Sequence, residues 1–524
     1  MKKKLNILIA ASEVVPFAKT GGLADVVGAL PKELEKMGHN VKIVMPRYYS
    51  VDKNKWNLKP TGGALGTPMG ALGEVWCGVL EGKLPGTNIP VYFIEHEQYF
   101  GRKGIYNEDN GQGFLDNDNR FAFFSKACLQ LCKMLNFKPD LIHVNDWQTA
   151  AIPIFINTTY RNDPLLKDAA TLLTIHNMQH QGNFYSGLMD VMDIGWEHFN
   201  FLEIECNDQV NLLKGGIYHS TLINTVSRGY AREIQTSEYG WGLENVIKDR
   251  SDDLYGIING IDYNEWNPET DKYIVANYSS KDLSGKAECK KDLQRCFGLP
   301  EKPDVPVIGI VSRLARQKGI DIIAEALYGL LDYDMQLVIL GTGEVWSHFY
   351  FGEAAGRFPN KIGCHIGYNN ALAHKIEAGS DFFLMPSRFE PCGLNQMYSL
   401  SYGTLPIVRA TGGLDDTIEN YNEETGEGTG FKFYDLTSKA IYNSIGWAIY
   451  TYYNKKDAMN KLIKQAMSKR FTWENSAKEY ENLYYQAVER CIGIERFKAF
   501  EIKEKLVSQD QQSAQIPVFE PAYQ

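Results

Sequence analysis

Two Gly-Gly turns are the parts of this sequence best suited to bind an anion. Gly21-Gly22 follows an apolar run and precedes a helical pattern, with Lys19 just before it. Thr411-Gly412-Gly413 follows another apolar run. A strand-to-helix turn of this kind exposes backbone N–H groups and the positive end of the helix dipole, which together hold a phosphate or a carboxylate. From its spacing alone, the first motif is explained equally well by a plain tight turn.

A third turn carries full positive charges. Arg313 and Lys318 come after a predicted strand over 307–311, and a helical pattern follows them. A ligand-binding loop belongs at this end of a parallel strand, although a solvated charged turn has the same composition. Three such turns favour a doubly phosphorylated ligand over a coincidence. None of them has the spacing of a Walker loop or of Gly-x-Gly-x-x-Gly.

Acidic and imidazole side chains also follow predicted strands. Asp146 and His176 each come at the end of an apolar run, and Glu390 follows the run 382–385. Their atoms suit hydrogen bonds to sugar hydroxyls, but each of these residues taken alone is more often structural.

Metal binding has weak support. Asp116-Asn117-Asp118 and Asp332-Tyr333-Asp334 both match the pattern Asp-x-Asp, and two matches in one chain show how common this pattern is. We expect both to be loops or helix caps. Cys128 and Cys132 have helical spacing and could ligate a metal, but two small buried side chains are the better interpretation.

The elements that would position these residues follow one pattern. Short apolar runs rich in β-branched residues alternate with helical patterns, which is typical of βαβ units that build a parallel sheet. The alternation stops over 259–304 and restarts at Val305. We therefore expect two doubly wound α/β halves with a joint between them. Such folds bind ligands at the carboxyl ends of their strands, so a cleft between facing halves is the expected place of the site.

Composition excludes several classes of protein. The 524 residues are 44% hydrophobic and 23% charged, the balance of a packed globule with more than one core. Lys and Arg total 54 against 64 Asp and Glu, a net charge of −10, which argues against nucleic acid or an anionic membrane as a partner.

No apolar run is long enough to span a bilayer. The run after Lys4 is interrupted by Asn6 and predicts a first strand, not a signal peptide. Nine cysteines without a paired framework fit a reducing, cytoplasmic compartment.

Several motifs occur together in the order known from one family. They lie at 19–26, 145–147, 174–177, 259–262, 312–314 with 318–319, 366–368, 389–394 and 410–414. On these motifs the chain resembles bacterial glycogen synthases, which are related to plant starch synthases. The resemblance covers about residues 5 to 488. It implies transfer of glucose from ADP-glucose to the non-reducing end of an α-1,4-glucan, with retention of configuration. Tyr398 stands where sucrose-synthase-like relatives carry a second Glu, which favours the glycogen and starch branch.

The resemblance implies a GT-B fold, that is, α/β with two doubly wound Rossmann-like domains facing across a deep cleft. The expected parts are an N-terminal catalytic domain on the acceptor side (1–258), an interdomain linker region (259–304), a C-terminal nucleotide-sugar domain (305–470), a helix that crosses back to the first domain (471–490) and a tail without an assigned role (491–524). The expected partners are ADP-glucose and an α-1,4-glucan or malto-oligosaccharide. No cofactor and no metal are expected.

The resemblance also implies six catalytic residues that hold the transferred glucose and the departing diphosphate: Lys19, Asp146, His176, Arg313, Lys318 and Glu390. Among them, Arg313 and Lys318 would bind the diphosphate. Asp146 and His176 would flank the glucose, whose hydroxyls Glu390 would bind.

Substrate binding is implied for a further set, in which Tyr368 would stack near the adenine and the second Gly-Gly turn would meet phosphate through its N–H groups. The set is Lys19, Gly21, Gly22, Asp25, Tyr368, Cys392, Gly393, Leu394, Thr411, Gly412 and Gly413. The residues alone leave ADP-glucose and UDP-glucose both open as donors.

Two other functions remain to be weighed. A glycan-binding scaffold would keep the fold and lack residues of the site, and none of them is missing here. A nucleotide-dependent oxidoreductase would need Gly-x-Gly-x-x-Gly in the first turn, which the sequence lacks.

Overall fold

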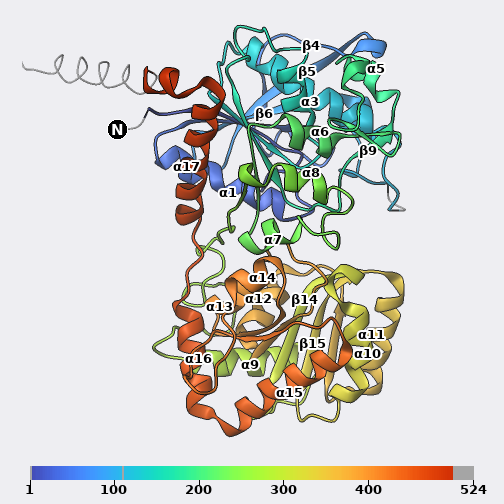
Figure 1. Ribbon diagram of the computed structural model, residues 1–524. Coiled ribbons are helices and arrows are strands. Elements are labelled where there is room, and N and C mark those ends of the chain that lie inside the picture. Colours follow the sequence, from blue (N-terminus) through green and yellow to red (C-terminus); the bar gives the residue numbers. More distant parts are fainter. Residues whose placement is uncertain (1–2, 109–110, 500–524) are drawn as a thin grey trace, which may run out of the picture. The chain divides into compact units, whose positions relative to one another are not determined.

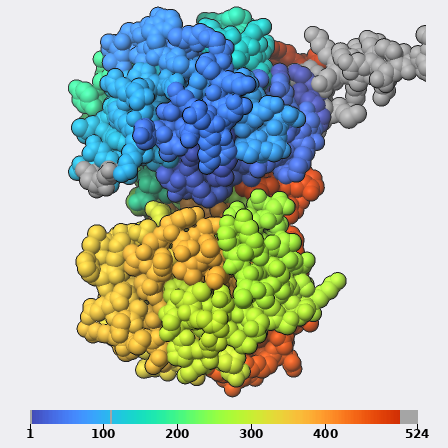
Figure 2. Space-filling view, turned by 180° about the vertical axis from the view of Figure 1, so that it is seen from behind, coloured from blue at the N-terminus to red at the C-terminus, as the bar shows by residue number. Residues whose placement is uncertain are grey.

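The computed structural model describes residues 3–108 and 111–499. It divides the chain into two compact units that are each assembled from separate segments. The first comprises Met1–Asn224, Gly240–Leu254 and Ala477–Gln524, and the second comprises Thr225–Tyr239 and Tyr255–Ser476. The segment 259–304, expected as a linker, belongs to the second unit and contains helix α9 (Ser284–Cys296). Figure 2 shows this segment in yellow-green on the surface of that unit.

A ten-stranded sheet forms the centre of the first unit, in the order β13-β12-β8-β7-β1-β2-β6-β5-β3, with β4 paired to β5. Strands β8, β7, β1, β2 and β6 pair in parallel, and β5 is antiparallel to β6. The strands are β1 (Asn6–Ala10), β2 (Asn40–Pro46), β3 (Lys59–Pro60), β4 (Leu65–Pro68), β5 (Glu74–Lys83), β6 (Pro90–Glu95), β7 (Leu141–Asn145), β8 (Ala170–Ile175), β12 (Leu222–Thr225) and β13 (Leu254–Gly256).

The helices of the first unit include α1 (Gly22–Lys36), α2 (Glu97–Phe100), α3 (Asn117–Met134), α4 (Ala151–Asn157), α5 (Leu188–Met192), α6 (Leu212–His219), α8 (Glu244–Asp249) and most of α17 (Trp473–Ile492). A small sheet, β10 (Glu205–Cys206), β11 (Gln209–Asn211) and β9 (Asn183–Tyr185), is also part of this unit.

Helix α17 is attached to the first unit by a chain of buried polar side chains. The Tyr484 hydroxyl lies 2.8 Å from Nδ1 of His143, whose Nε2 lies 2.6 Å from Thr174 Oγ1. Thr174 donates to Asn224, and the Asn224 amide donates to Tyr480. These bonds satisfy polar groups that would be costly to bury alone. From Ala477 onward, helix α17 therefore completes the unit formed by the beginning of the chain.

The second unit holds a six-stranded sheet in the order β16-β15-β14-β17-β18-β19, and all its pairs are parallel. Its strands are β14 (Val307–Leu314), β15 (Gln336–Gly343), β16 (Ile362–Ile366), β17 (Phe382–Met385), β18 (Leu405–Arg409) and β19 (Phe431–Phe433). Its helices include α7 (Arg228–Glu233), α10 (Ile320–Leu330), α11 (Val345–Arg357), α12 (Asn370–Gly379), α13 (Asn395–Ser401), α14 (Gly412–Thr417), α15 (Ser438–Asn454) and α16 (Lys456–Ser468).

Two apolar cores cover the two faces of this second sheet. Ile308, Ile310 and Leu337 pack with α10 and α15 on one face, and Val307 and Val338 pack with α9 and α12 on the other. Alternate residues of one strand thus serve opposite cores, which explains why the strands read as continuous apolar runs. Figure 1 shows helices on both sides of β14 and β15. The prediction of two doubly wound α/β halves is confirmed.

In the parallel part of each sheet, the strand order reverses at one point. Strand β1 lies between β7 and β2, and β14 lies between β17 and β15, so the chain moves outward to both sides from each of these strands. Crevices at the carboxyl ends of strands beside such a reversal are the usual ligand positions of this fold.

Candidate active site

In the first unit, the predicted residues follow neighbouring strands. Lys19 comes after β1, Asp146 directly after β7 and His176 directly after β8, and these strands pair in the order β8-β7-β1. The structure thus brings the carboxyl ends of all three strands to one edge of the sheet, beside the reversal between β7 and β1.

The first Gly-Gly turn is organised by a carboxylate that sequence reasoning missed. Glu13 is buried and accepts hydrogen bonds from the backbone N–H groups of Thr20 and Gly21 and, at 2.6 Å, from the Thr20 hydroxyl. The Tyr106 hydroxyl also donates to it, over 2.6 Å. A Cβ built on Gly21 or on Gly22 would meet no atom within 4 Å. The N–H of Gly21 is therefore turned toward Glu13, while the space beside both glycines is open to a ligand.

Lys19 is already paired at the mouth of this turn. Its Nζ lies 2.7 Å from Oδ1 of Asp25, in the first turn of α1, and about half of the lysine side chain is exposed. An exposed pair of this kind is worth little in free energy, so Lys19 is able to exchange Asp25 for a ligand phosphate. Asp25, expected among the substrate-binding residues, is thus positioned to orient Lys19.

Asp146 is held in an unusual backbone conformation and a buried position. Its φ of 55° is left-handed, and Oδ1 accepts the backbone N–H of His176 over 2.7 Å. Burial raises the pKa of Asp146 to about 7, although backbone N–H groups of His176 and Asn177 act in the opposite direction. The carboxyl group is therefore poised between its two protonation states near neutral pH.

His176 is a neutral imidazole. Burial lowers its pKa to about 3. The Asn145 amide donates to the carbonyl of Ala10, which turns Oδ1 of Asn145 toward Nε2 of His176 at 2.9 Å. Nε2 must then carry the proton, and Nδ1 keeps a lone pair that can accept a hydroxyl hydrogen bond. Asn145 lies in the same motif as Asp146, but its role was not recognised from the sequence.

In the second unit, the cationic turn meets Glu390. Lys318 Nζ lies 2.5 Å from Oε2 of Glu390, to which the Ser387 hydroxyl also donates over 3.0 Å. Arg313 is exposed at the end of β14 and donates to Gln317 over 2.8 Å. Because β14 and β17 are neighbours, the residues that follow them converge beside the reversal of this sheet.

The second Gly-Gly turn repeats the arrangement of the first. Glu233 on α7 accepts the Thr411 hydroxyl and the backbone N–H of Gly412, each over 2.8 Å. The N–H of Gly413 donates to the Glu390 carbonyl over 3.0 Å. A Cβ on Gly412 would lie 2.1 Å from that same carbonyl oxygen, so only glycine allows this close approach. Both N–H groups thus have protein partners, and a phosphate would have to share or displace them.

The remaining predicted residues divide into exposed and buried ones. Tyr368, after β16, is 87% exposed and its ring is free to stack. Cys392 is buried, and burial raises the pKa of its thiol to about 12, so it is not a nucleophile. Gly393 has a φ of 73° just before α13, which makes the bend between Cys392 and Leu394.

The weak metal patterns have structural explanations. Asp116 is the N-cap residue of α3 and pairs with Arg102 over 2.5 Å, and Asp334 accepts from Tyr453. Cys128 and Cys132 are buried free thiols on α3. The expectation of loops, caps and core side chains is confirmed for these residues.

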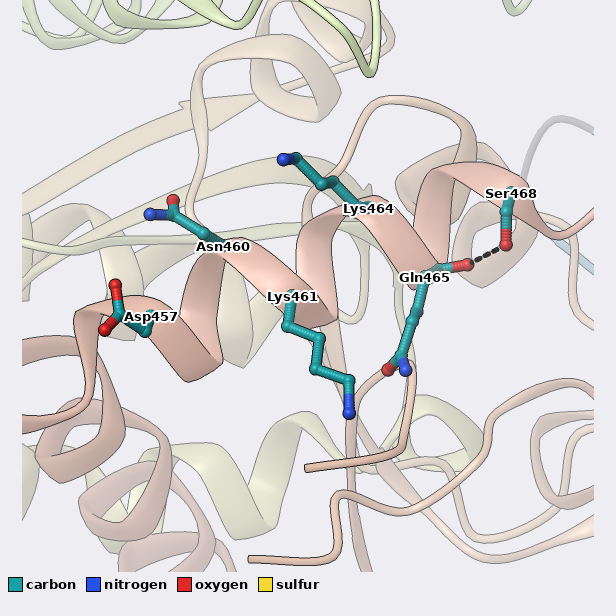
Figure 3. A pocket seen from close by; sticks show the side chains of 6 residues that line it. All are labelled: Asp457, Asn460, Lys461, Lys464, Gln465 and Ser468. Atoms are coloured by element: carbon teal, nitrogen blue, oxygen red, sulfur yellow. Dashed lines mark hydrogen bonds between the residues drawn. The ribbon is translucent and has the colours of Figure 1, made fainter. Parts of the chain in front are cut away.

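A surface hollow of about 490 Å³ lies elsewhere, along one face of α16. Figure 3 shows its lining side chains, which all come from this helix: Asp457, Asn460, Lys461, Lys464, Gln465 and Ser468. None of the predicted site residues lines this hollow. Among the described residues, no helix combines the length and apolarity needed to cross a membrane.

Comparison with known proteins agrees with the two-part organisation. Residues 6–249 match the starch synthase catalytic domain, and residues 296–481 match the glycosyl transferases group 1. These matches, together with two doubly wound α/β units whose cations and glycine turns follow strand ends, place the chain in the class of glycosyltransferases.

Similar full-length proteins define the family. Glycogen synthase 1 of Geobacter metallireducens is 62% identical over 94% of this chain and 98% of its own length. Glycogen synthase of Treponema denticola is 45% identical over 93% and 99%. The chain therefore belongs to the glycogen synthase family. The catalytic domain of starch synthase IV from Arabidopsis thaliana, solved bound to ADP and acarbose, matches with a TM-score of 0.85 and 33% identity over 93% of this chain and all of that domain.

Proposed function

We propose that this protein elongates an α-1,4-glucan by transferring glucose from ADP-glucose to its non-reducing end, with retention of configuration. The observation that carries the proposal lies beside the reversal of the second sheet, where Lys318 follows β14 and pairs with Glu390, which follows β17, and where Arg313 lies near the end of β14. Cations and a carboxylate at the ends of neighbouring strands suit a ligand that joins a diphosphate to a polyhydroxyl group. Family membership supports the same activity.

ADP-glucose is proposed as the donor because the starch synthase IV domain, similar to this chain over most of its length, was solved with ADP. Tyr368 offers an exposed ring on which a base can stack, and this contact does not discriminate strongly between bases.

The difficult step is cleavage of the bond between the anomeric carbon of glucose and a phosphate oxygen. Negative charge accumulates on the diphosphate as this bond breaks, and Arg313, Lys318 and Lys19 are proposed to stabilise it. Removal of one such donor typically slows a reaction by about 10²- to 10³-fold. We propose that the chain needs no metal and no cofactor for this step, because these three cations supply the charge.

The groups of the first unit are proposed to hold the transferred glucose. Neutral His176 presents Nδ1 as an acceptor, and Asp146 lies beside it with a carboxyl group poised near neutral pH. Glu390 uses Oε2 for Lys318 and is proposed to accept a sugar hydroxyl through Oε1. Since none of these groups is a clear nucleophile, retention is assigned to attack of the acceptor hydroxyl on the face that the diphosphate leaves.

Release of nucleotide from purified protein with short malto-oligosaccharides tests the proposal. ADP-glucose and UDP-glucose are compared, each with and without EDTA. We expect acceptor-dependent release that prefers ADP-glucose and persists in EDTA. A preference for UDP-glucose would overturn the donor assignment, loss in EDTA would overturn the metal-free mechanism, and no release with either donor would favour a glycan-binding scaffold. We further propose a cytoplasmic enzyme that uses neither nucleic acid nor a membrane.

A further inference from the structure

Two histidines and one glutamate gather in the first unit, and none of them belongs to the residues proposed for glucose transfer. His198 is the last residue of the short helix Trp196–His198, Glu203 lies in the turn before β10, and His219 is the last residue of α6. One ligand atom from each residue lies within 4.8 Å of the other two. Two imidazoles and a carboxylate form a common ligand set for zinc.

All three side chains converge on one carboxylate oxygen. Oε2 of Glu203 lies 2.7 Å from Nδ1 of His198 and 3.2 Å from Nε2 of His219. A tetrahedral ion at the usual zinc distance separates its ligand atoms by about 3.3 Å. The two observed separations are shorter than this value, and the third, between the two histidine nitrogens, is at most 4.8 Å, so a modest adjustment of the side chains would admit an ion.

The His219 ring provides a second, independent observation. Only 7% of its side chain is exposed, and Nε2 is a buried atom that makes no hydrogen bond with any described residue. Its nearest charged neighbour is Oε2 of Glu203, at 3.2 Å. A buried polar atom without a hydrogen bond is unfavourable, and coordination of a cation would satisfy it.

The neighbouring groups hold the cluster in a form that can bind an ion. The Asn200 amide donates to Oε1 of Glu203 over 3.1 Å, which directs Oε2 toward the two rings. Arg250 donates to the carbonyls of Ile217 and Tyr218 and pairs with Asp253, so its charge is engaged beside the cluster and not within it.

We propose that His198, Glu203 and His219 bind a divalent zinc ion, with water in the fourth position. Imidazole ligands select zinc and related transition metals over magnesium and calcium. The ion would tie the segment before β10 to the end of α6. This segment has little packing of its own, since Phe201 is 78% and Leu202 68% exposed. The ion therefore stabilises this part of the first unit and takes no part in glucose transfer.

Titration of the metal-free full-length protein with Zn²⁺ against a chromophoric chelator tests the proposal. We expect one zinc ion to bind per chain. Glu203→Gln should lower the affinity for zinc by at least about 100-fold, since even outer-shell partners of a metal are worth about 10- to 100-fold in affinity. Glu197→Gln, an exposed carboxylate in the same segment, is the matched control and leaves the affinity unchanged. Zinc also raises the thermal unfolding midpoint of the unmodified protein and of the control.

His198→Gln provides a second variant if Glu203→Gln does not fold, because 24% of the His198 side chain is exposed and its loss leaves no large cavity. It is expected to weaken zinc binding as well. Equal affinity in the control and in both cluster variants would place the ion elsewhere, for example on the exposed thiols of Cys296 and Cys491, and would overturn the proposal. The proposal would also be overturned if no zinc binds at concentrations up to about 100 μM, which as a Kd corresponds to a binding free energy of about −5.5 kcal/mol.

Discussion

Nζ of Lys318 and Oε2 of Glu390 lie 2.5 Å apart, although the two residues are separated by 72 positions in the sequence. Only 19% of the lysine side chain and 7% of the glutamate side chain are exposed. The pair is therefore shielded from water, and each partner neutralises the other until a ligand arrives. In the proposed reaction a departing diphosphate competes with Glu390 for Lys318, and the carboxylate holds the cation in place until then.

Lys318→Ala is expected to lower kcat by about 10²- to 10³-fold, the usual loss when one charge-stabilising donor is removed. The thermal unfolding midpoint should change far less. Arg316→Ala is the matched control, because Arg316 lies in the same turn with 75% of its side chain exposed. Steady-state kinetics with ADP-glucose measure both variants. An unchanged kcat for Lys318→Ala would contradict the assigned role.

Glu13→Gln is expected to disorder the first Gly-Gly turn, because one amide oxygen cannot replace two carboxylate oxygens that accept from Thr20 and Gly21. We expect KM for the donor to rise by about tenfold, the effect of about 1.4 kcal/mol, a typical value for a hydrogen bond to a charged group. Tyr106→Phe removes one hydroxyl from the same carboxylate and leaves the backbone contacts in place. Equal kinetics for the two variants would show that Glu13 does not position the turn.

Tyr368→Ala tests stacking on the base. The side chain is 87% exposed, so the variant should fold normally. Loss of a stacking contact of about 1–3 kcal/mol raises KM for ADP-glucose by about 5- to 150-fold. Tyr368→Phe keeps the ring and should retain the original KM. If alanine and phenylalanine variants behave alike, the ring does not contact the base.

Acid is expected to destabilise the first unit through His143. Burial lowers the pKa of this imidazole to about 3, while in an unfolded chain the pKa of histidine is about 6.5. The unfolded state therefore binds more protons between these values, and the free energy of unfolding falls as the pH drops through this window. His143→Gln should be less stable at pH 7 and should lose less stability on acidification. Thermal unfolding between pH 7 and pH 5 measures both effects.

The strands and most of the proposed site could be predicted from the sequence for one physical reason. Strands covered on both faces are continuous apolar runs, and polar residues that interrupt the chain directly after them fall at the ligand-binding edge. Asp146 and His176 follow their strands directly, and Lys19 and Lys318 lie in the turns that come after β1 and β14. Their predicted roles in catalysis await the measurements above.

Residues that act through distant partners could not be found in this way. Glu233 reaches Thr411 across 178 positions, and no local pattern links a helix residue to a turn so far along the chain. The sequence signal for Glu13 is weak, since it is only a carboxylate shortly after an apolar run and before a glycine pair, and its burial is seen only in the structure. The zinc cluster was missed because His198, Glu203 and His219 follow no common metal-binding spacing.

The bonds between Tyr484 and His143 and between Tyr480 and Asn224 also bear on how the protein is made. During synthesis, the strands that carry His143 and Asn224 leave the ribosome long before helix α17 exists. The unit translated first is therefore closed only when nearly the whole chain has emerged. Until then, polar groups of its central sheet lack the partners that they have in the folded protein, so a nascent chain that stops before Ala477 has no complete first unit to fold into.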